Sequence, residues 1–224
     1  MWLATKWRKG AKSLVTTMIL LASAQLALAL TPAPPRTLLV MGDSLSAAHG
    51  LATEQGWVHL LAERLTRERP EWRVVNASIS GETTAGGAAR IDAALKQHAP
   101  ALVVIQLGAN DALRGLPLDL ARANLERMIT ASKAQGAQVL LVGIRIPPNY
   151  GPDYAEQLRA MYVELAQQHG LALLPFLLEP IAAERDAFQA DNLHPTAAAQ
   201  PRLLAHVWTA LQPLLAQPAV ASAR

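Results

Sequence analysis

The segment TLLVMGDSLS, residues 37–46, is the most informative part of the sequence for the fold. Its first five residues, Thr37–Met41, form an apolar run without polar alternation, which predicts a strand buried on both faces. Gly42 then permits a sharp turn, and Asp43 and Ser44 follow at the end of this strand. Similar runs predict four more strands, at 74–77, 101–107, 139–144 and 171–174.

Longer amphipathic segments separate these runs and predict helices, most of them followed by proline or glycine. We expect the helices at 57–69, 85–98, 117–135, 153–169 and 197–215. Strands that are apolar on both faces need helices on each side, and right-handed crossovers keep such strands parallel. The sequence therefore predicts an α/β protein, a three-layer α/β/α sandwich around a mostly parallel five-stranded sheet. Functional groups of such folds gather at the carboxyl ends of the strands.

The first 36 residues are expected to lie outside this domain. Basic residues precede an apolar stretch from about Leu14 to Leu28, and Ala27 and Ala29 are the small residues that a signal peptidase recognises. We expect a signal peptide at 1–29, a proline-rich leader at 30–36, one folded domain at 37–215 and a flexible tail at 216–224. The alternative is a membrane anchor, but polar residues interrupt the apolar stretch. The mature protein is then periplasmic or secreted, without a stable membrane anchor.

Composition narrows the range of partners. The chain has 224 residues, of which 51% are hydrophobic, enough for one compact domain. The expected signal peptide carries four of the 20 lysine and arginine residues and none of the 17 acidic residues, so the remainder has a net charge of −1. This balance predicts no nucleic-acid partner. The absence of cysteine excludes disulfides, thiolate metal sites and a cysteine nucleophile.

Two segments could supply a nucleophile and its base. Ser44 stands at a strand-to-helix junction, where a serine can be a nucleophile or simply a helix cap. Asp191 and His194 share one loop, and their spacing lets the carboxylate bond one imidazole nitrogen while the other points outward. The alternative is that Asp191 caps the last helix and His194 is incidental.

The positions of the six histidines favour His194 as the base. Only His49 and His194 are expected in loops at strand ends. The others lie within or at the ends of predicted helices, and they are His59, His98, His169 and His206. His49 has no carboxylate at a suitable spacing, so we interpret it as a loop or pocket residue.

Two further strand ends offer donors for an oxyanion. The N–H of Gly81 could approach a substrate closely, and the side-chain amide of Asn110 could donate a second hydrogen bond. Each residue also has an ordinary alternative, as a turn glycine or as a turn or capping residue. Together, however, Ser, Gly, Asn and Asp-x-x-His follow one another at the ends of successive elements, which favours acyl transfer.

These blocks resemble those of the SGNH (GDSL) hydrolase superfamily, named after its serine, glycine, asparagine and histidine. The resemblance covers about residues 37–215 and rests on GDSLS (42–46), Gly81, GAND (108–111) and DNLHP (191–195). Stretches such as VNASISG (75–81) and IRIPPNYG (144–151) resemble one bacterial type, the multifunctional acyl-CoA thioesterase, protease I and lysophospholipase. The resemblance implies the flavodoxin-like SGNH hydrolase fold.

By this resemblance, Ser44 is the nucleophile, His194 the general base and Asp191 the carboxylate that orients it. The N–H groups of Ser44 and Gly81 and the side chain of Asn110 form the oxyanion hole. The resemblance also implies substrate-binding residues in the flanking loops, namely Leu113, Arg114, Arg145 and Tyr150.

The implied activity is that of a monomeric serine esterase which hydrolyses carboxylic esters, thioesters or lysophospholipids without a metal or organic cofactor. Ala109 and Ala112 replace glycines of many relatives, which could stiffen the loop and change the substrate range. The alternatives are a carbohydrate acetylesterase of the same superfamily, a non-catalytic acyl-binding module, or a metal-dependent hydrolase. The ligands of that hydrolase would be Asp43, Asp111, Asp191 and His194. An α/β-hydrolase is disfavoured because the chain lacks Gly-x-Ser-x-Gly.

Overall fold

The computed structural model describes residues 35–146 and 150–217. The predicted signal peptide, most of the predicted leader and residues 218–224 of the predicted tail lie outside this part. A five-stranded sheet in the order β2-β1-β3-β4-β5 forms the centre of the domain, and all its pairings are parallel. The strands are β1 (Arg36–Gly42), β2 (Trp72–Asn76), β3 (Leu102–Gln106), β4 (Gln138–Val142) and β5 (Ala172–Leu174).

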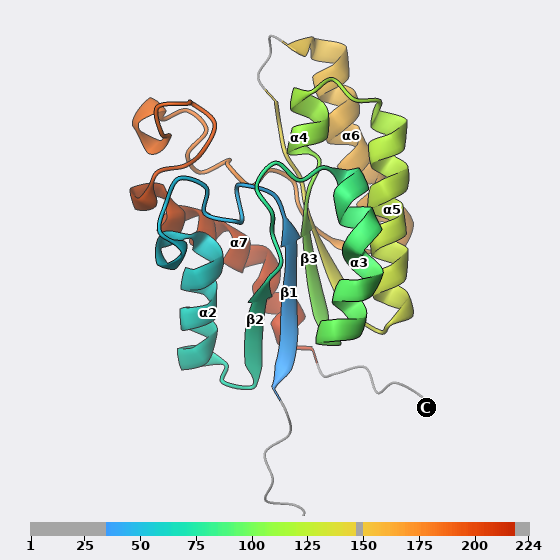
Figure 1. Cartoon of the computed structure of the whole chain (residues 1–224), viewed down its shortest axis with the longest axis vertical. Helices are drawn as coiled ribbons and strands as arrows, with labels where there is room; N and C mark the ends of the chain where they lie inside the picture. The colour runs from blue at the N-terminus through green and yellow to red at the C-terminus, as the bar shows by residue number, and fades with distance from the viewer. Residues whose placement is uncertain (1–34, 147–149, 218–224) are drawn as a thin grey trace, which may run out of the picture. The chain divides into compact units, whose positions relative to one another are not determined.

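Helices cover both faces of this sheet (Figure 1). One face carries α3 (Thr84–His98), α5 (Leu118–Ala134) and α6 (Pro152–His169), and the other carries α2 (Trp57–Glu68) and α7 (Gln200–Leu215). A short helix, α4 (Ala109–Leu113), lies at the carboxyl edge, and single 3₁₀ turns occur at Thr53–Gln55, Arg185–Ala187 and Ala197–Ala199. The predicted three-layer sandwich is confirmed. Within the described ranges, no helix is both long and apolar enough to cross a membrane.

The central strands β1 and β3 are buried because their side chains are apolar on both faces. They pair in register from Leu38 with Leu102 to Gly42 with Gln106. The chain leaves β1 for β2 on one side and returns to β3 on the other, so the strand order reverses between β1 and β3. Ligands of open α/β sheets bind at such a reversal, outside the carboxyl ends of the strands. Ser44 and Asn110 follow these two strands.

Three local features differ from the expected pattern. The predicted strand at 74–77 begins earlier, at Trp72, because this edge strand pairs with β1 from Arg36 onward. The predicted helix at 197–215 is a 3₁₀ turn followed by α7, which begins at Gln200. Helix α4 was not predicted, because a single helical turn has little stability of its own and shows no periodic pattern.

Helix α4 is held by contacts with other elements. The carboxylate of Asp111 accepts bonds from the N–H of Thr84 (2.9 Å) and from its hydroxyl (2.6 Å) at the start of α3. Gly108 enters α4 with a φ of 120°, and a Cβ at this position would overlap the hydroxyl of Tyr162. The turn therefore requires glycine, and these contacts together fix the position of Asn110.

Candidate active site

Ser44 lies in the turn that follows β1, where the backbone passes close to neighbouring side chains. A Cβ on Gly42 would stand 2.7 Å from the Cβ of Ser46 and 2.9 Å from Oε1 of Gln106. No larger residue fits there without a shift of these neighbours. Gly42 thus allows the tight turn that brings Ser44 to the carboxyl edge of the sheet.

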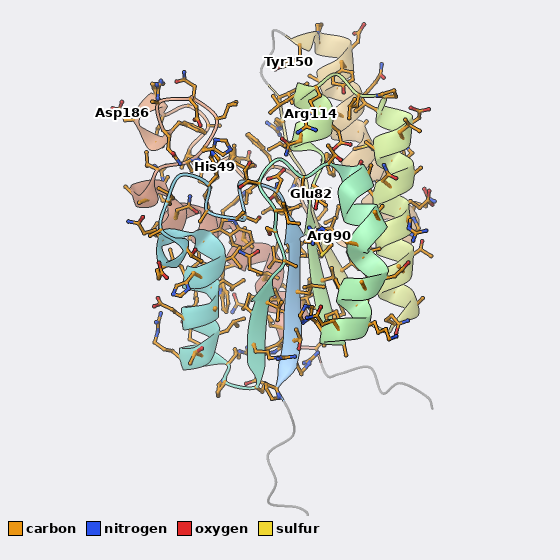
Figure 2. The ribbon with its side chains drawn as sticks, viewed as in Figure 1. His49, Glu82, Arg90, Arg114, Tyr150 and Asp186 are labelled. Atoms are coloured by element: carbon orange, nitrogen blue, oxygen red, sulfur yellow. The ribbon has the colours of Figure 1, made fainter. Side chains whose placement is uncertain are left out.

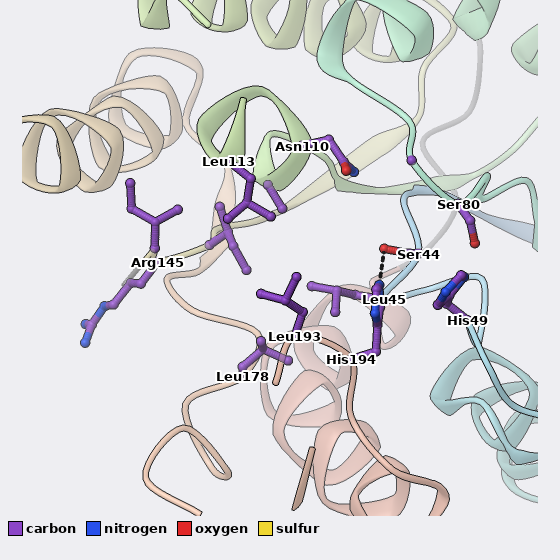
Figure 3. Close-up of a pocket in the computed structure, with 14 residues that line it drawn as sticks. Ser44, Leu45, His49, Ser80, Asn110, Leu113, Arg145, Leu178, Leu193 and His194 are labelled. Atoms are coloured by element: carbon purple, nitrogen blue, oxygen red, sulfur yellow. Dashed lines mark hydrogen bonds between the residues drawn. The ribbon is translucent and has the colours of Figure 1, made fainter. Parts of the chain in front are cut away.

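The structure brings Ser44, His194 and Asp191 together although 150 residues separate the serine from the histidine. Nε2 of His194 lies 2.9 Å from Oγ of Ser44 (Figure 3), and Nδ1 lies 2.6 Å from Oδ2 of Asp191. The proton on Nδ1 can then bond the carboxylate, which leaves Nε2 free to accept the serine proton. The geometry fits a nucleophile, a base and an orienting carboxylate.

The carboxylate of Asp191 is held in its charged form. The bond from the side chain of His194 lowers the pKa of Asp191 most, and the N–H groups of His194 and Leu193 lower it further through bonds to Oδ1. Asn192 adopts a positive φ of 61°, which lets the loop turn back between the carboxylate and the ring. Asp191 therefore stays ionised at any pH at which the protein would work.

The loop of His194 is joined to the loop of Ser44 by Gln189 and His49. Nε2 of Gln189 donates to the carbonyl oxygens of His49 (2.8 Å) and Pro195 (3.0 Å). The ring of His49 lies against that of His194, with 4.3 Å between their centroids and a tilt of 39°. His49 also lines the cavity beside Ser44, as expected for a pocket residue. No local spacing in the sequence indicated its contact with His194.

Three possible donors belong to residues that line the cavity at Ser44. Gly81 has a φ of 80°, and the N–H groups of Ser44 and Gly81 make no hydrogen bond to any group in the described residues. Nδ2 of Asn110 donates one bond to the carbonyl of Glu82 (2.9 Å), which orients the amide and leaves its second hydrogen free. These groups can receive the negative charge of an oxyanion.

An apolar cavity of about 270 Å³ extends from this polar end. In Figure 3, Leu113, Leu178 and Leu193 lie between Ser44 and Arg145, which marks the far end. Further apolar wall residues are Leu45, Ala109, Ile144 and Ile146.

The residues predicted to bind substrate are placed in two different ways. Leu113 and Arg145 line the cavity, and the guanidinium of Arg145 lies 5.2 Å from the ring centroid of Phe176. Arg114 and Tyr150 are not among the lining residues. Arg114 instead donates a bond to the carbonyl of Gly81, and Tyr150 is an exposed residue before α6.

Residues 40–201 match the model of the GDSL-like Lipase/Acylhydrolase family, which is more than half of the chain. The chain belongs to the GDSL-like lipase/acylhydrolase family. This agrees with the resemblance seen in the sequence, and the expected serine ester hydrolase is confirmed.

Similar proteins of known name or structure support this family assignment. The hydrolase is 54% identical to Esterase TesA of Pseudomonas aeruginosa over 198 residues, which are 88% of this chain and 98% of TesA. It is 40% identical to Thioesterase 1/protease 1/lysophospholipase L1 of Escherichia coli over 179 residues, 80% of this chain and 85% of the relative. The crystal structure of esterase EstA from Pseudoalteromonas sp., inhibited by monoethylphosphonate, is similar with a TM-score of 0.78 and 40% identity, and the match covers 81% of this chain and all of EstA.

A buried network of polar side chains stabilises the turn after β1 that carries Ser44 in this GDSL-like hydrolase. Oδ1 of Asp43 accepts bonds from the N–H of Leu45 (3.0 Å) and from Nε2 of Gln106 (3.1 Å). Oε1 of Gln106 accepts the hydroxyl of Ser46 (2.6 Å). Burial raises the pKa of Asp43 to about 6, although these bonds act in the opposite direction. Gln106 was not identified from the sequence. The one local signal for it was that a polar residue ends the apolar run of β3.

The stability of the fold should respond to the protonation of Asp43. The pKa of this group is about 6 in the folded protein and 3.8 ordinarily, so the folded state favours its protonated form. The stability that this protonation contributes is fully present below pH 3.8 and is lost as pH rises through 6. Asp43→Asn has no charge to bury and should keep its bonds through Oδ1. Relative to wild type, the variant should gain about 2 kcal/mol of unfolding free energy between pH 4 and pH 8. Urea unfolding at both pH values measures this difference, and parallel pH profiles would show that Asp43 is not responsible.

The acidic residues considered as metal ligands have other partners. Both oxygens of Asp111 accept from Thr84, and both oxygens of Asp191 accept from its own loop. Within residues 35–146 and 150–217, no group of three or more His, Asp or Glu side chains could hold a metal ion.

Proposed function

We propose that this hydrolase cleaves carboxylic esters and thioesters through an acyl-enzyme on Ser44. The observation that carries the proposal is the continuous chain of bonds from Asp191 through His194 to Ser44. This chain ends at the polar end of an apolar cavity, beside the donors of Gly81 and Asn110. The arrangement provides each group that acyl transfer requires.

The first half-reaction forms the acyl-enzyme. Nε2 of His194 accepts the proton of the Ser44 hydroxyl while Oγ attacks the carbonyl carbon. The carbonyl oxygen becomes negative and is stabilised by the N–H groups of Ser44 and Gly81 and by the amide of Asn110. The bond to the leaving oxygen or sulfur then breaks, and His194 returns its proton to the leaving group.

The second half-reaction releases the acid. His194 takes a proton from water, and the hydroxide formed attacks the acyl carbon on Ser44. The same donors stabilise the second oxyanion, and Oγ leaves with the proton from His194. Asp191 stays ionised throughout, holds the productive tautomer and stabilises the imidazolium that forms twice in each cycle.

The cavity indicates which substrates suit this reaction. Its wall next to Ser44 is aliphatic, so we propose that an apolar acyl or aryl group lies against Leu113 and Leu178 and extends toward Arg145. Aryl esters, acyl thioesters and lysophospholipids all offer such a group. A carbohydrate acetylesterase is less well supported, because an acetyl group leaves most of this apolar wall uncovered.

The cellular location is part of the same proposal. Cleavage of the expected signal peptide near Leu30 would place a soluble monomer in the periplasm or outside the cell, without a nucleic-acid partner. Acyl-CoA is mainly cytoplasmic, so lipids and exogenous esters are the substrates that such an enzyme would meet.

One mass-spectrometric experiment tests the nucleophile and the processing together. Protein from the exported fraction should have the intact mass of a chain that starts at or near Leu30. Incubation with a fluorophosphonate should add one label, and peptide mapping should place it on Ser44, because only an activated serine reacts. The labelled protein should also lose its activity against a panel of esters, acyl-CoAs and lysophospholipids.

The controls separate the two parts of this proposal. His194→Ala should prevent labelling, because Ser44 then lacks its base. A label on Ser46, Ser78 or Ser80 would disprove the assignment of Ser44 whatever the family. Full-length chain recovered from the membrane would disprove cleavage and favour an anchored enzyme.

A further inference from the structure

Helix α4 and Arg114, the residue that follows it, hold the loop that contains Gly81 at two adjacent carbonyl groups. Nδ2 of Asn110 donates to the carbonyl of Glu82 (2.9 Å), and Nη2 of Arg114 donates to the carbonyl of Gly81 (3.0 Å). Asn110 and Arg114 are four residues apart, which places their side chains on the same side of one helical turn. Two side chains four residues apart thus donate to the carbonyl groups of two consecutive residues, Gly81 and Glu82.

The opposite side of this loop is attached to α3. The carboxylate of Glu82 lies 2.6 Å from Nε of Arg90, and the side chain of Glu82 is only 12% exposed. Figure 2 shows Arg90 on the α3 side of Glu82 and Arg114 at the carboxyl edge on the side of α4. The loop at Gly81 and Glu82 is therefore attached to α3 by an ion pair, and to α4 and the residue after it by two hydrogen bonds.

The element that carries Arg114 is itself well fixed. Asp111 binds Thr84 through both carboxylate oxygens, and Ala112 is fully buried. Alanine has a much higher helix propensity than glycine, so Ala109 and Ala112 favour the helical turn. The guanidinium of Arg114 accordingly reaches the carbonyl of Gly81 from a helical turn that these contacts hold in place.

We propose that Arg114 is a positioning residue for the oxyanion hole. Its bond to the carbonyl of Gly81 holds this residue at its φ of 80°, beside the cavity that both Gly81 and Asn110 line, where the free N–H of Gly81 can act as a donor. Arg114 does not line the cavity, so it acts through Gly81 and not through the substrate. This inference rests on the proposed function of Ser44.

The inference predicts how the kinetic constants respond. Negative charge on the carbonyl oxygen exists only near the transition state, so a displaced Gly81 N–H lowers kcat and leaves KM nearly unchanged. The factor should be equal for acetyl and octanoyl esters, because Arg114 touches neither acyl group. A substrate-binding arginine would instead change KM, and by an amount that depends on the substrate.

The experiment compares Arg114→Gln and Arg114→Lys with wild type on both esters. Arg114→Gln should lower kcat about tenfold, less than the 10²-fold that a full 1 Å misplacement can cause, because Asn110 still holds the neighbouring carbonyl. Arg114→Lys keeps a cationic donor and should recover part of this loss. Arg36→Gln is the matched control, since Nη1 of Arg36 also donates to a carbonyl, that of Gln217 (2.9 Å), at the other end of β1. Its kcat should equal that of wild type.

Melting temperatures and Ser44 labelling are measured for every variant, so that kcat refers to folded, titrated sites. Either a kcat of Arg114→Gln within twofold of wild type or a KM that rises with acyl length would overturn the positioning role. So would Arg114→Lys with no more activity than Arg114→Gln. Wild type without turnover or label would overturn the proposed function and this inference with it, whereas active wild type with unchanged Arg114 variants would overturn this inference alone.

Discussion

Ser44→Ala should lower kcat on a short-chain ester on the order of 10⁶-fold. The loss is this large because no other group would attack the carbonyl, and the oxyanion donors alone give only modest catalysis. The variant should remain folded, since Ser44 is partly exposed and its hydroxyl bonds only His194 among the described residues. Steady-state rates and a melting curve test both statements.

A double variant tests whether the two residues act as one unit. His194→Ala should lose nearly as much activity as Ser44→Ala, and the combined variant should lose no more than either alone. Ser78→Ala is a suitable control in a neighbouring loop, because its buried hydroxyl has no partner in the described part of the chain. This control should turn over like wild type. Independent, multiplicative losses at Ser44 and His194 would contradict the proposed nucleophile and base.

Asn110→Ala should lower kcat about 10²–10³-fold while KM changes much less. The amide donates one hydrogen to the carbonyl of Glu82, and Asn110 lines the cavity beside Ser44, so we expect its remaining hydrogen to reach the oxyanion. This bond strengthens as charge develops on the substrate oxygen, which is why its loss affects the chemical step. Steady-state rates on one short-chain ester, corrected by titration of active sites with an acylating probe, give this factor.

A purely structural role for Asn110 makes a different prediction. If this residue only stabilises the turn, Asn110→Ala lowers the melting temperature, and the folded fraction keeps nearly normal turnover. Asn124→Ala is the matched control, because this amide donates to the hydroxyl of Thr84 (3.2 Å) and supports α4 without reaching the cavity. It should lower stability with little change in kcat. A folded Asn110→Ala within about threefold of wild type would remove Asn110 from the oxyanion hole.

The layered fold followed from local sequence patterns. Continuous apolar runs predicted β1, β3 and β4, because a strand that is buried on both faces has apolar residues at successive positions. Proline and glycine after the amphipathic segments predicted where the helices end. The pairing of Asp191 with His194 was also predictable, because the two residues lie three positions apart in one loop. All these features depend on residues that are close in the chain.

Other features were decided by the tertiary structure. Gln106 bonds Asp43 across 63 residues, Arg114 bonds Gly81 across 33, and His49 contacts His194 from a different loop. Helix α4 is stabilised by the hydrogen bonds between Thr84 and the carboxylate of Asp111, and its own residues form no periodic pattern. Local spacing in the sequence indicates backbone preference and amphipathicity, but it does not predict which distant side chains will be in contact. These long-range contacts follow from the strand order and the packing of the helices, which bring the ends of β1, β2 and β3 to one edge of the sheet.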